Sequence, residues 1–251
     1  MTDQELDDDL RSLDHVAEER GAAALDTIRA AVQRMRDDGD FGRLMWALPP
    51  LARSYALCER FEEAEAAANE ALAHFRVNGS VRGQALALNA LGVVAVRRGV
   101  PSRALEVAGE AVVLARAAGD PILQVRIANT LGIVLNDIGR LTEAVQIFEE
   151  GLRAARGFPG EAVVLRLRSN LSLALGRWAL KEHDERLSEA IWRPRAERAI
   201  ELMRPTLQAW REQGKWNEIC NALDHLAISY IVLGDLAAAH ASLDEDRKSV
   251  V

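Results

Sequence analysis

The feature that most constrains the fold of this chain is an internal repeat with a period of 40 residues. The stretch Gln84 to Arg116 recurs as Gln124 to Arg156. Within it, Leu131-Gly132 stands where Leu91-Gly92 stood, an offset of 132 − 92 = 40. A fixed period of this length indicates a solenoid, in which each repeat is one structural unit stacked on its neighbours.

The composition favours helices and argues against nucleic acid as a partner. The 251 residues are 49% hydrophobic but only 5% aromatic. This bias is typical of helices packed closely through small side chains, and it disfavours a β-sandwich. The formal charge of −7 and the absence of a basic stripe give no surface for phosphate groups. We therefore expect an all-α protein that does not bind nucleic acid.

Cysteine and histidine usage predicts neither a metal site nor a cofactor. Cys58 and Cys220 lie far apart, and the five histidines are dispersed without metal-ligand spacing. The acidic start lacks the basic-then-apolar order of a signal peptide. No apolar run approaches the roughly 18 to 20 residues that cross a bilayer. We expect a cytoplasmic protein with no membrane partner.

The repeats divide the chain into a short N-terminal part and a long array. Residues 1–40 read as a helical pair, either a degenerate repeat or a cap. Residues 41–251 form the array, with repeats at about 45–76, 85–116, 125–156, 165–215 and 220–251. The fourth repeat is longer, because the shift from Ser172 to Ala227 is 227 − 172 = 55, and we place the insertion near 179–196. Pro49-Pro50 predicts that the helix of the first repeat kinks or begins there.

The end of the array lacks the polar capping helix that usually closes a solenoid. Residues 244–251 are too short to form one. We therefore expect the sequence to be a piece of a longer protein.

The repeated positions resemble the tetratricopeptide repeat. The pattern is Leu-Gly in the first helix, a large residue three later, a glycine at the turn, and alanines in the second helix, as in Leu91-Gly92, Gly99 and Ala104. The resemblance implies an all-α, right-handed superhelix of about five to six helical hairpins. The 40-residue period is similar to the longer-helix variety found in kinesin light chains, in bacterial peptide-pheromone receptors and in sensory regions of bacterial signalling proteins. Leu226 to His240 resembles the last repeat before the catalytic domain of bacterial tetratricopeptide diguanylate cyclases, although no Gly-Gly-Asp-Glu-Phe-type loop occurs in the chain.

The candidate binding residues form a polar ladder on the first helices. Asn89 and Asn129 share one repeat position, and Asn170 lies one place further on. In the resembled families this part of the first helix lines a concave groove, which implies a peptide or protein segment as the partner. A carboxamide both donates and accepts hydrogen bonds, as a peptide unit does. The alternative is that these side chains satisfy helix crossings or face water.

Three further polar residues join the candidate site. Arg126 and Arg166 each occupy the second position of a repeat and could bind a carboxylate, and Asn136 is expected on the same helix face. Surface solvation is the alternative explanation for the arginines.

Two other groups of residues are candidate sites. Trp178 and Trp192 flank the insertion, either as partner contacts or as anchors of a long loop. Asp224-His225 could suggest acid-base chemistry, but no nucleophile accompanies the pair in the sequence, so a structural histidine is favoured.

The sequence therefore predicts a binding scaffold and not an enzyme. The resemblance favours the regulatory or sensory region of a bacterial signalling protein, such as a diguanylate cyclase, with a peptide or protein segment in the concave groove. The alternative is a freestanding adaptor that forms a homodimer or assembles a complex through the open end of the array near Leu243.

Overall fold

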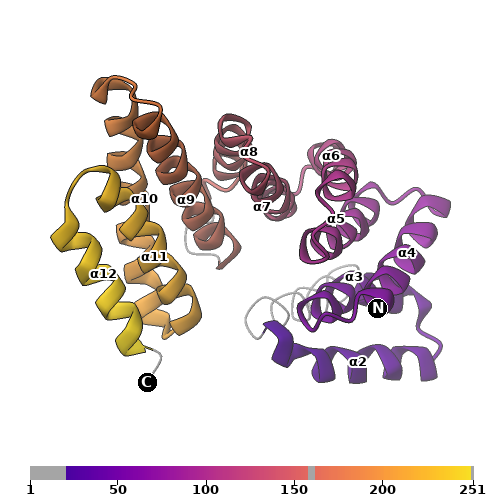
Figure 1. Ribbon diagram of the computed structural model, residues 1–251. Helices are drawn as coiled ribbons and strands as arrows, with labels where there is room; N and C mark the ends of the chain where they lie inside the picture. The colour runs from indigo at the N-terminus through magenta and orange to yellow at the C-terminus, as the bar shows by residue number, and fades with distance from the viewer. Residues whose placement is uncertain (1–20, 158–161, 250–251) are drawn as a thin grey trace. The chain divides into compact units, whose positions relative to one another are not determined.

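The computed structural model describes residues 21–157 and 162–249, and all regular structure in these ranges is helical (Figure 1). The chain divides into two compact units, Met1–Val134 and Leu135–Val251, which we call the N-terminal and the C-terminal unit. The N-terminal unit contains η1 (Gly21–Ala24), α2 (Leu25–Asp37), α3 (Phe41–Leu57), α4 (Phe61–Val77), α5 (Val81–Arg97), α6 (Pro101–Ala118) and most of α7 (Pro121–Asp137). The C-terminal unit contains α8 (Leu141–Ala154), α9 (Ala162–Asp184), α10 (Glu189–Gln213), α11 (Trp216–Val232) and α12 (Leu236–Ser249).

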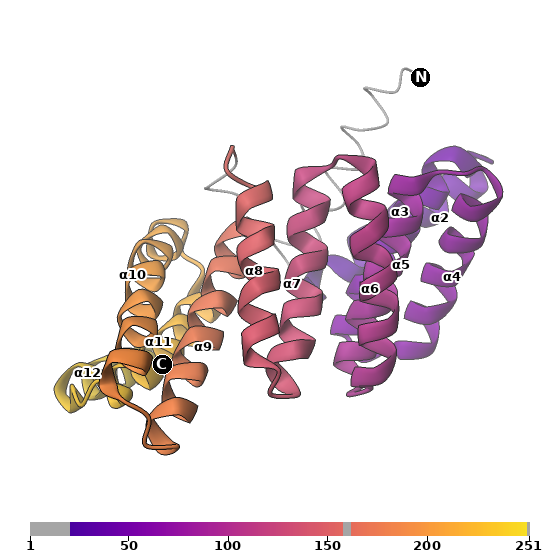
Figure 2. The same ribbon diagram turned by 90° about the horizontal axis from the view of Figure 1, so that it is seen from above.

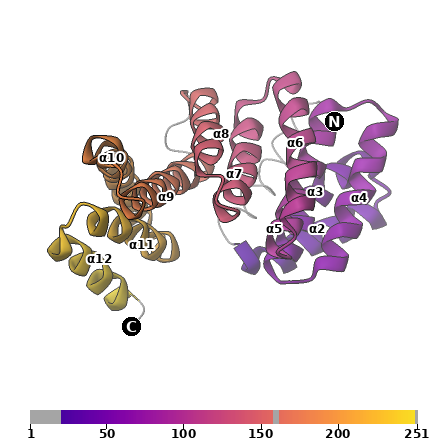
Figure 3. The same cartoon turned by 45° about the horizontal axis from the view of Figure 1, so that its top comes forward.

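Within each unit the helices pack as consecutive hairpins. In the N-terminal unit α3 pairs with α4 and α5 with α6, as Figure 2 shows for the magenta and purple helices. In the C-terminal unit α9 pairs with α10 and α11 with α12 (Figure 3). We call α3, α5, α7, α9 and α11 the first helices, because successive ones also touch each other, α3 with α5 and α9 with α11. The predicted all-α fold of hairpin repeats is confirmed.

The expected N-terminal pair is described only in part. The second of its helices, expected at Ala22 to Arg36, corresponds to η1 and α2. The first, expected within residues 1–20, lies outside the described residues. The division of the chain at residue 40 stays a prediction.

Side-chain caps recur every 40 residues at the starts of the first helices in the N-terminal unit. Asp40 Oδ1 accepts from the Arg43 amide at 3.1 Å, Ser80 Oγ from the Gly83 amide at 3.2 Å, and Asp120 Oδ1 from the Leu123 amide at 3.0 Å. Each cap satisfies an amide that has no partner within the helix. The cap spacing therefore reproduces the sequence period.

The helices end in left-handed turns that mostly carry glycine. At the end of α5, Gly99 has φ of 71°, the Gly99 amide donates to Val96 O at 3.0 Å, and the Val100 amide donates to Ala95 O at 2.9 Å. This is a Schellman arrangement, which glycine adopts without a steric penalty. One repeat earlier Glu59 takes the same conformation, with φ of 59°. That turn is therefore strained.

Small side chains allow the two helices of a hairpin to approach closely. Ala64, Ala104 and Ala144 occupy one repeat position, and each is fully buried. The first helices contribute a larger residue at another shared position, where Leu48 and Leu88 are buried. The apolar positions identified by the period therefore form the core of the hairpins.

Pro49 and Pro50 lie inside α3, which begins at Phe41. Of the two alternatives, a helix that begins at the prolines was therefore wrong, and a kink at the prolines stays a prediction. The Asp40 cap and the burial of Leu44, Leu48 and both prolines stabilise the helix against the two missing amide donors.

The insertion in the fourth repeat is helical and lengthens both helices of one hairpin. The two helices α9 and α10 have 23 and 25 residues, whereas α3, α5 and α11 have 17 each. The added turns meet at a tight connection in which Arg186 has φ of 57°. Trp192 is buried there against Ala179, Ala196 and Val232.

Candidate functional site

The predicted polar ladder begins on α5 as a contact inside the N-terminal unit. The Asn89 side chain is 3% exposed, and its Oδ1 accepts a hydrogen bond from Thr130 Oγ1 on α7 at 2.9 Å. Thr130 Oγ1 also lies 3.2 Å from Arg126 O, one turn earlier. The carboxamide oxygen of Asn89 thus joins two successive first helices. A direct clamp on a peptide by Asn89 stays a prediction.

The other ladder residues lie on α7 and α9 and are half-buried. Arg126 and Asn129 are three residues apart on α7, and Arg166 and Asn170 are four residues apart on α9. Both spacings place the two side chains on one face of their helix. One first helix in each unit therefore presents a guanidinium and a carboxamide together.

Arg166 is held in place by a partner on the next first helix. Its Nη1 lies 3.3 Å from Glu218 Oε1 on α11, and both side chains are half-buried. The remaining predicted residue, Asn136, is buried near the end of α7, where its Nδ2 lies 3.4 Å from Asp137 Oδ1. Asn136 Oδ1 has no hydrogen-bond partner within the described part of the chain.

A hydrogen-bonded pair between α9 and α11, Ser169 with His225, was not predicted from the sequence. Ser169 Oγ and His225 Nδ1 lie 3.1 Å apart. Ser169 is the residue 40 positions after Asn129, so it and not Asn170 continues the ladder position. His225 is the counterpart of Thr130, since 130 + 40 + 55 = 225. Counting the offset strictly would have found the pair, because Asn89 with Thr130 and Ser169 with His225 join the same two repeat positions.

The Ser169–His225 pair is suited to structure and not to catalysis. Burial lowers the pKa of His225 to about 4, so the imidazole is neutral and only weakly basic at neutral pH. The hydroxyl-bearing Ser169 is 4% exposed, which leaves a substrate no access to its oxygen. Nothing in this arrangement shows a catalytic site.

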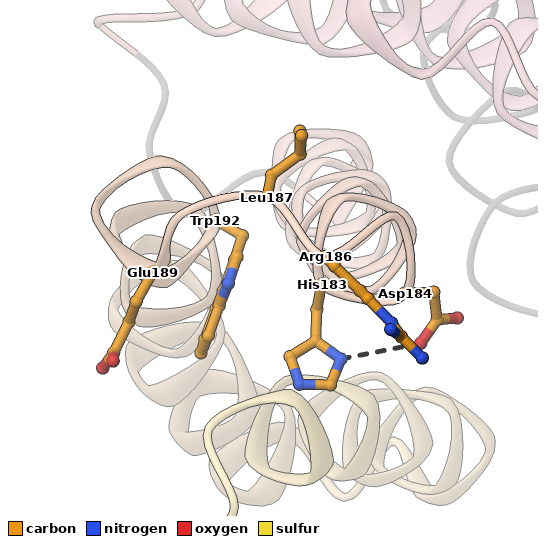
Figure 4. A pocket seen from close by; sticks show the side chains of 6 residues that line it. All are labelled: His183, Asp184, Arg186, Leu187, Glu189 and Trp192. Carbon is orange, nitrogen blue, oxygen red and sulfur yellow. Dashed lines mark ion pairs between the residues drawn. The ribbon is translucent and has the colours of Figure 1, made fainter.

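A cavity of about 530 Å³ lies at the connection between α9 and α10 (Figure 4). Trp192 and His183 face each other there, with ring centroids 5.2 Å apart and the rings nearly perpendicular. His183 Nδ1 also lies 3.5 Å from Asp184 Oδ1. The other flanking tryptophan, Trp178, packs under the Arg195 guanidinium at 4.0 Å. Both predicted tryptophans therefore pack against other parts of the C-terminal unit.

Two classes of site find no support in the described residues. They include no cluster of three or more His, Cys, Asp or Glu residues that could hold a metal ion. None of the described helices is long and apolar enough to cross a membrane.

The sequence profile of the tetratricopeptide repeat matches residues 125–156, which is the third of the predicted repeats. The chain has the tetratricopeptide-repeat fold. Among curated proteins no sequence matches the chain.

Solved tetratricopeptide-type structures align over most of the chain. BtubC (BKLC) from P. vanneervenii is 19% identical with a TM-score of 0.65, and the alignment covers 93% of this chain and 91% of that one. A putative kinesin light chain from Podosopora anserina is 15% identical, with a TM-score of 0.58 and coverages of 87% and 95%. A Rap protein complexed with Competence and Sporulation Factor is 12% identical, with a TM-score of 0.65 and coverages of 96% and 64%. At these identities the similarity shows the fold alone.

Proposed function

We propose that this chain is a binding scaffold in which the first helices of each unit hold an extended segment of a partner protein or a peptide. The observation that carries the proposal is the repeated pairing of an arginine with an asparagine on one helix face. In the N-terminal unit the pair is Arg126 and Asn129 on α7, and in the C-terminal unit it is Arg166 and Asn170 on α9. A carboxamide matches a peptide unit, and a guanidinium matches a carboxylate.

The burial pattern supports this assignment. The buried Asn89 links α5 to α7, and the buried Ser169 links α9 to α11. These contacts lie between successive first helices and fix them side by side, next to the half-buried pairs. Asn89 is then a positioning residue, and Asn129 and Asn170 are the residues that contact the ligand.

Peptide selection followed by titration tests the proposal. The full chain is used to select from a displayed library of random dodecapeptides, and the enriched peptides are titrated against wild-type protein. We expect Asn129→Ala or Asn170→Ala to weaken binding by about tenfold, as expected for two lost hydrogen bonds of about 0.7 kcal/mol each. The matched control is Asn69→Ala, because Asn69 is exposed on the second helix α4.

Two results would contradict the proposal. One is a library from which no peptide is enriched. The other is an enriched peptide that binds both asparagine variants as tightly as it binds the wild type and the Asn69→Ala control.

We further propose that the scaffold is the regulatory region of a bacterial signalling protein, in which occupancy of the first-helix face alters an output. Among proteins of similar fold, the Rap protein named above is described in complex with a factor that it binds. The measurement is the activity of the native gene product with and without a selected peptide. An unchanged activity at saturating peptide would contradict this role.

The adaptor alternative rests on exposed aliphatic side chains in the last hairpin. Ile231 on α11 and Leu236 on α12 are 49% and 61% exposed. Such side chains favour self-association when they form a patch. Sedimentation equilibrium separates the two functions, because a mass that rises with protein concentration and falls in Leu236→Ser supports the adaptor.

A further inference from the structure

One cavity in the C-terminal unit has a filled counterpart in the N-terminal unit. The turn glycines Gly79 and Gly99 correspond to Gly214 and Gly234, because 214 − 79 and 234 − 99 both equal 135. The segment from α4 to α6 is therefore in register with the segment from α10 to α12, which permits a comparison position by position.

In the N-terminal unit this place is occupied by an arginine of the chain itself. Arg98, at the end of α5, forms ion pairs with Glu62 and Glu65 on the preceding second helix, the latter at 2.9 Å. Its guanidinium carbon lies 5.5 Å from the centre of the Phe61 ring. Two carboxylates and an aromatic ring thus hold one guanidinium between α4 and the α5–α6 turn.

In the C-terminal unit Leu233 stands at the Arg98 position, since 98 + 135 = 233. A cavity of about 460 Å³ lies there, between α10 and the α11–α12 turn. Glu197, the counterpart of Glu62, still lines it, and Ile200 and Leu233 supply apolar lining. The cavity thus keeps the carboxylate of this position, while a leucine stands where the N-terminal unit has Arg98.

The charges around the cavity leave carboxylates available. Glu201 and Asp235 line it as well, and neither has an ion-pair partner among the side chains described in residues 23–157 and 162–244. Asp235 Oδ1 accepts a hydrogen bond from the Ala238 amide at 3.0 Å, which leaves its second carboxylate oxygen for a cation. The two arginines that line the cavity each contact another residue of its lining. Arg193 forms ion pairs with Glu189 and with Glu197, the second at 3.6 Å. Arg204 Nη2 lies 3.5 Å from the Tyr230 hydroxyl.

The aromatic wall of the cavity selects between cations. Tyr230 stands where the N-terminal unit has Ala95, since 95 + 135 = 230, so this cavity has a ring beside its carboxylates. A planar guanidinium stacks on an aromatic ring and bonds a carboxylate at its edge, whereas an ammonium does so less well. The chain uses this pairing itself, with Arg60 4.7 Å from the Tyr55 ring centre and Arg195 4.0 Å from that of Trp178.

We propose that this cavity is a docking site for an arginine side chain of a partner protein, which takes the place that Arg98 fills in the N-terminal unit. The arginine stacks against Tyr230, its methylenes cover Ile200 and Leu233, and its guanidinium pairs with Glu201 and Asp235. The site lies between α10 and the α11–α12 turn, with Tyr230 from the end of α11, and it includes none of the arginines and asparagines of α7 and α9 that carry the proposed function.

Methyl NMR of the full chain with a small probe tests the site. N-acetyl-arginine amide is titrated while the methyl signals of Ile200 and Leu233 are followed, and a saturable shift is expected. N-acetyl-lysine amide should bind more weakly, and N-acetyl-glutamate amide should cause no saturable shift. Absence of a saturable shift with the arginine probe, or equal binding of the glutamate probe, overturns the proposal.

Two variants locate the binding. Leu233→Arg supplies the missing guanidinium from the chain itself and should abolish probe binding. Because that variant could alter folding, Glu201→Gln provides a second test and should weaken the arginine probe by about fivefold, the effect of one partly exposed ion pair of about 1 kcal/mol. The control Glu212→Gln, on the same helix but outside the cavity, should leave binding unchanged. Probe binding that Glu201→Gln does not reduce overturns the assignment.

The test is independent of the first-helix site. Asn170→Ala should leave arginine-probe binding unchanged whether or not it affects peptide binding. Failure of peptide selection therefore leaves this cavity unaffected, and failure of the probe leaves the first-helix proposal unaffected.

Discussion

The two compact units differ in the side chains that join successive first helices and in those beside the following turn. In the N-terminal unit the seam between α5 and α7 is joined by Asn89 and Thr130, and the space beside the α5–α6 turn is closed by Arg98. In the C-terminal unit the seam between α9 and α11 is joined by Ser169 and His225, and the space beside the α11–α12 turn is an open cavity.

The difference shows which repeat positions are free to diverge. The fully buried alanines recur because the close helix contact leaves no room for a larger side chain, and most of the left-handed turns carry glycine, with Glu59 as a strained exception. The seam positions carry two different hydrogen-bonded pairs, Asn89 with Thr130 and Ser169 with His225, and only the second is titratable. Beside the turn, Leu233 of the C-terminal unit replaces Arg98 of the N-terminal unit, and the space that Arg98 fills corresponds to the candidate cavity.

Gly83→Ala, in the N-terminal unit, should give the largest loss of stability. A Cβ on Gly83 would lie 2.3 Å from the ring of Phe75, which is buried and packs against Trp46. We expect a loss of about 3 kcal/mol in the free energy of unfolding, the upper end for overpacking a rigid site. Urea unfolding measures it.

The matched control is Gly109→Ala on α6, where a Cβ would meet nothing within 4 Å. This change should stabilise the chain by up to about 1 kcal/mol through helix propensity. Similar effects of the two substitutions would show that the space around Gly83 adapts.

Acid should weaken the C-terminal seam and not the N-terminal one. His225 has a folded pKa of about 4 against its usual 6.5, so between these values the unfolded chain binds a proton that the folded chain excludes. Stability is therefore retained above pH 6.5 and falls as pH decreases toward 4, by about 3 kcal/mol. Unfolding free energies from pH 7.5 to pH 4 measure the loss.

His225→Asn isolates the contribution of the imidazole from that of the carboxylates. This variant keeps a polar partner for Ser169 but cannot titrate in this range. It should lose about 3 kcal/mol less than the wild type between pH 7.5 and pH 4. Parallel pH profiles for the two proteins would show that His225 is not the source.

Gly176→Ala should destabilise the C-terminal seam in a way that a second substitution repairs. Its Cβ would lie 2.8 Å from Ser229 Oγ on α11. We expect a loss of about 1 to 2 kcal/mol, and recovery in the double variant Gly176→Ala, Ser229→Ala, because the clash involves only the hydroxyl. If the double variant is as unstable as the single one, the added Cβ clashes with the α11 backbone and not with the Ser229 hydroxyl.

Glu59→Gly should give the smallest change and should stabilise the chain. Glu59 is the non-glycine residue among the recurrent turns of the N-terminal unit, with φ of 59°. Relief of the left-handed strain is worth about 1 kcal/mol. The thermal midpoint measures the gain, and Gly99→Ala, at the equivalent turn, should lower it. A lower thermal midpoint for Glu59→Gly than for the wild type would show that the backbone at Glu59 is not strained.

Local sequence signals predicted the hairpins because each one acts within a few residues. The 40-residue period and the recurrent small residues such as Ala104 identified the hairpins, whereas the caps at Asp40, Ser80 and Asp120 were found in the structure. Pro49-Pro50 led to a wrong prediction of where α3 begins. Burial of the α3 side chains outweighs the tendency of proline to interrupt a helix. The insertion could be located from the count but not assigned a conformation.

The sequence predicted only part of the candidate site. Residue type pointed to Asn89, Asn129 and Asn170, yet the burial of Asn89 depends on α7, and Ser169 and His225 meet only because α9 packs against α11. The arginine cavity has no motif at all. It becomes visible when the two units are aligned through their turn glycines, since the signal is a missing Arg98 counterpart.

The measurement that tests the central claim most directly is hydrogen–deuterium exchange of the full chain with and without a selected peptide. If the first helices hold the ligand, added protection should fall on α7 and α9, and the second helices α4, α6 and α10 should exchange as before. Protection confined to the second helices, with α7 and α9 unchanged, would contradict the account.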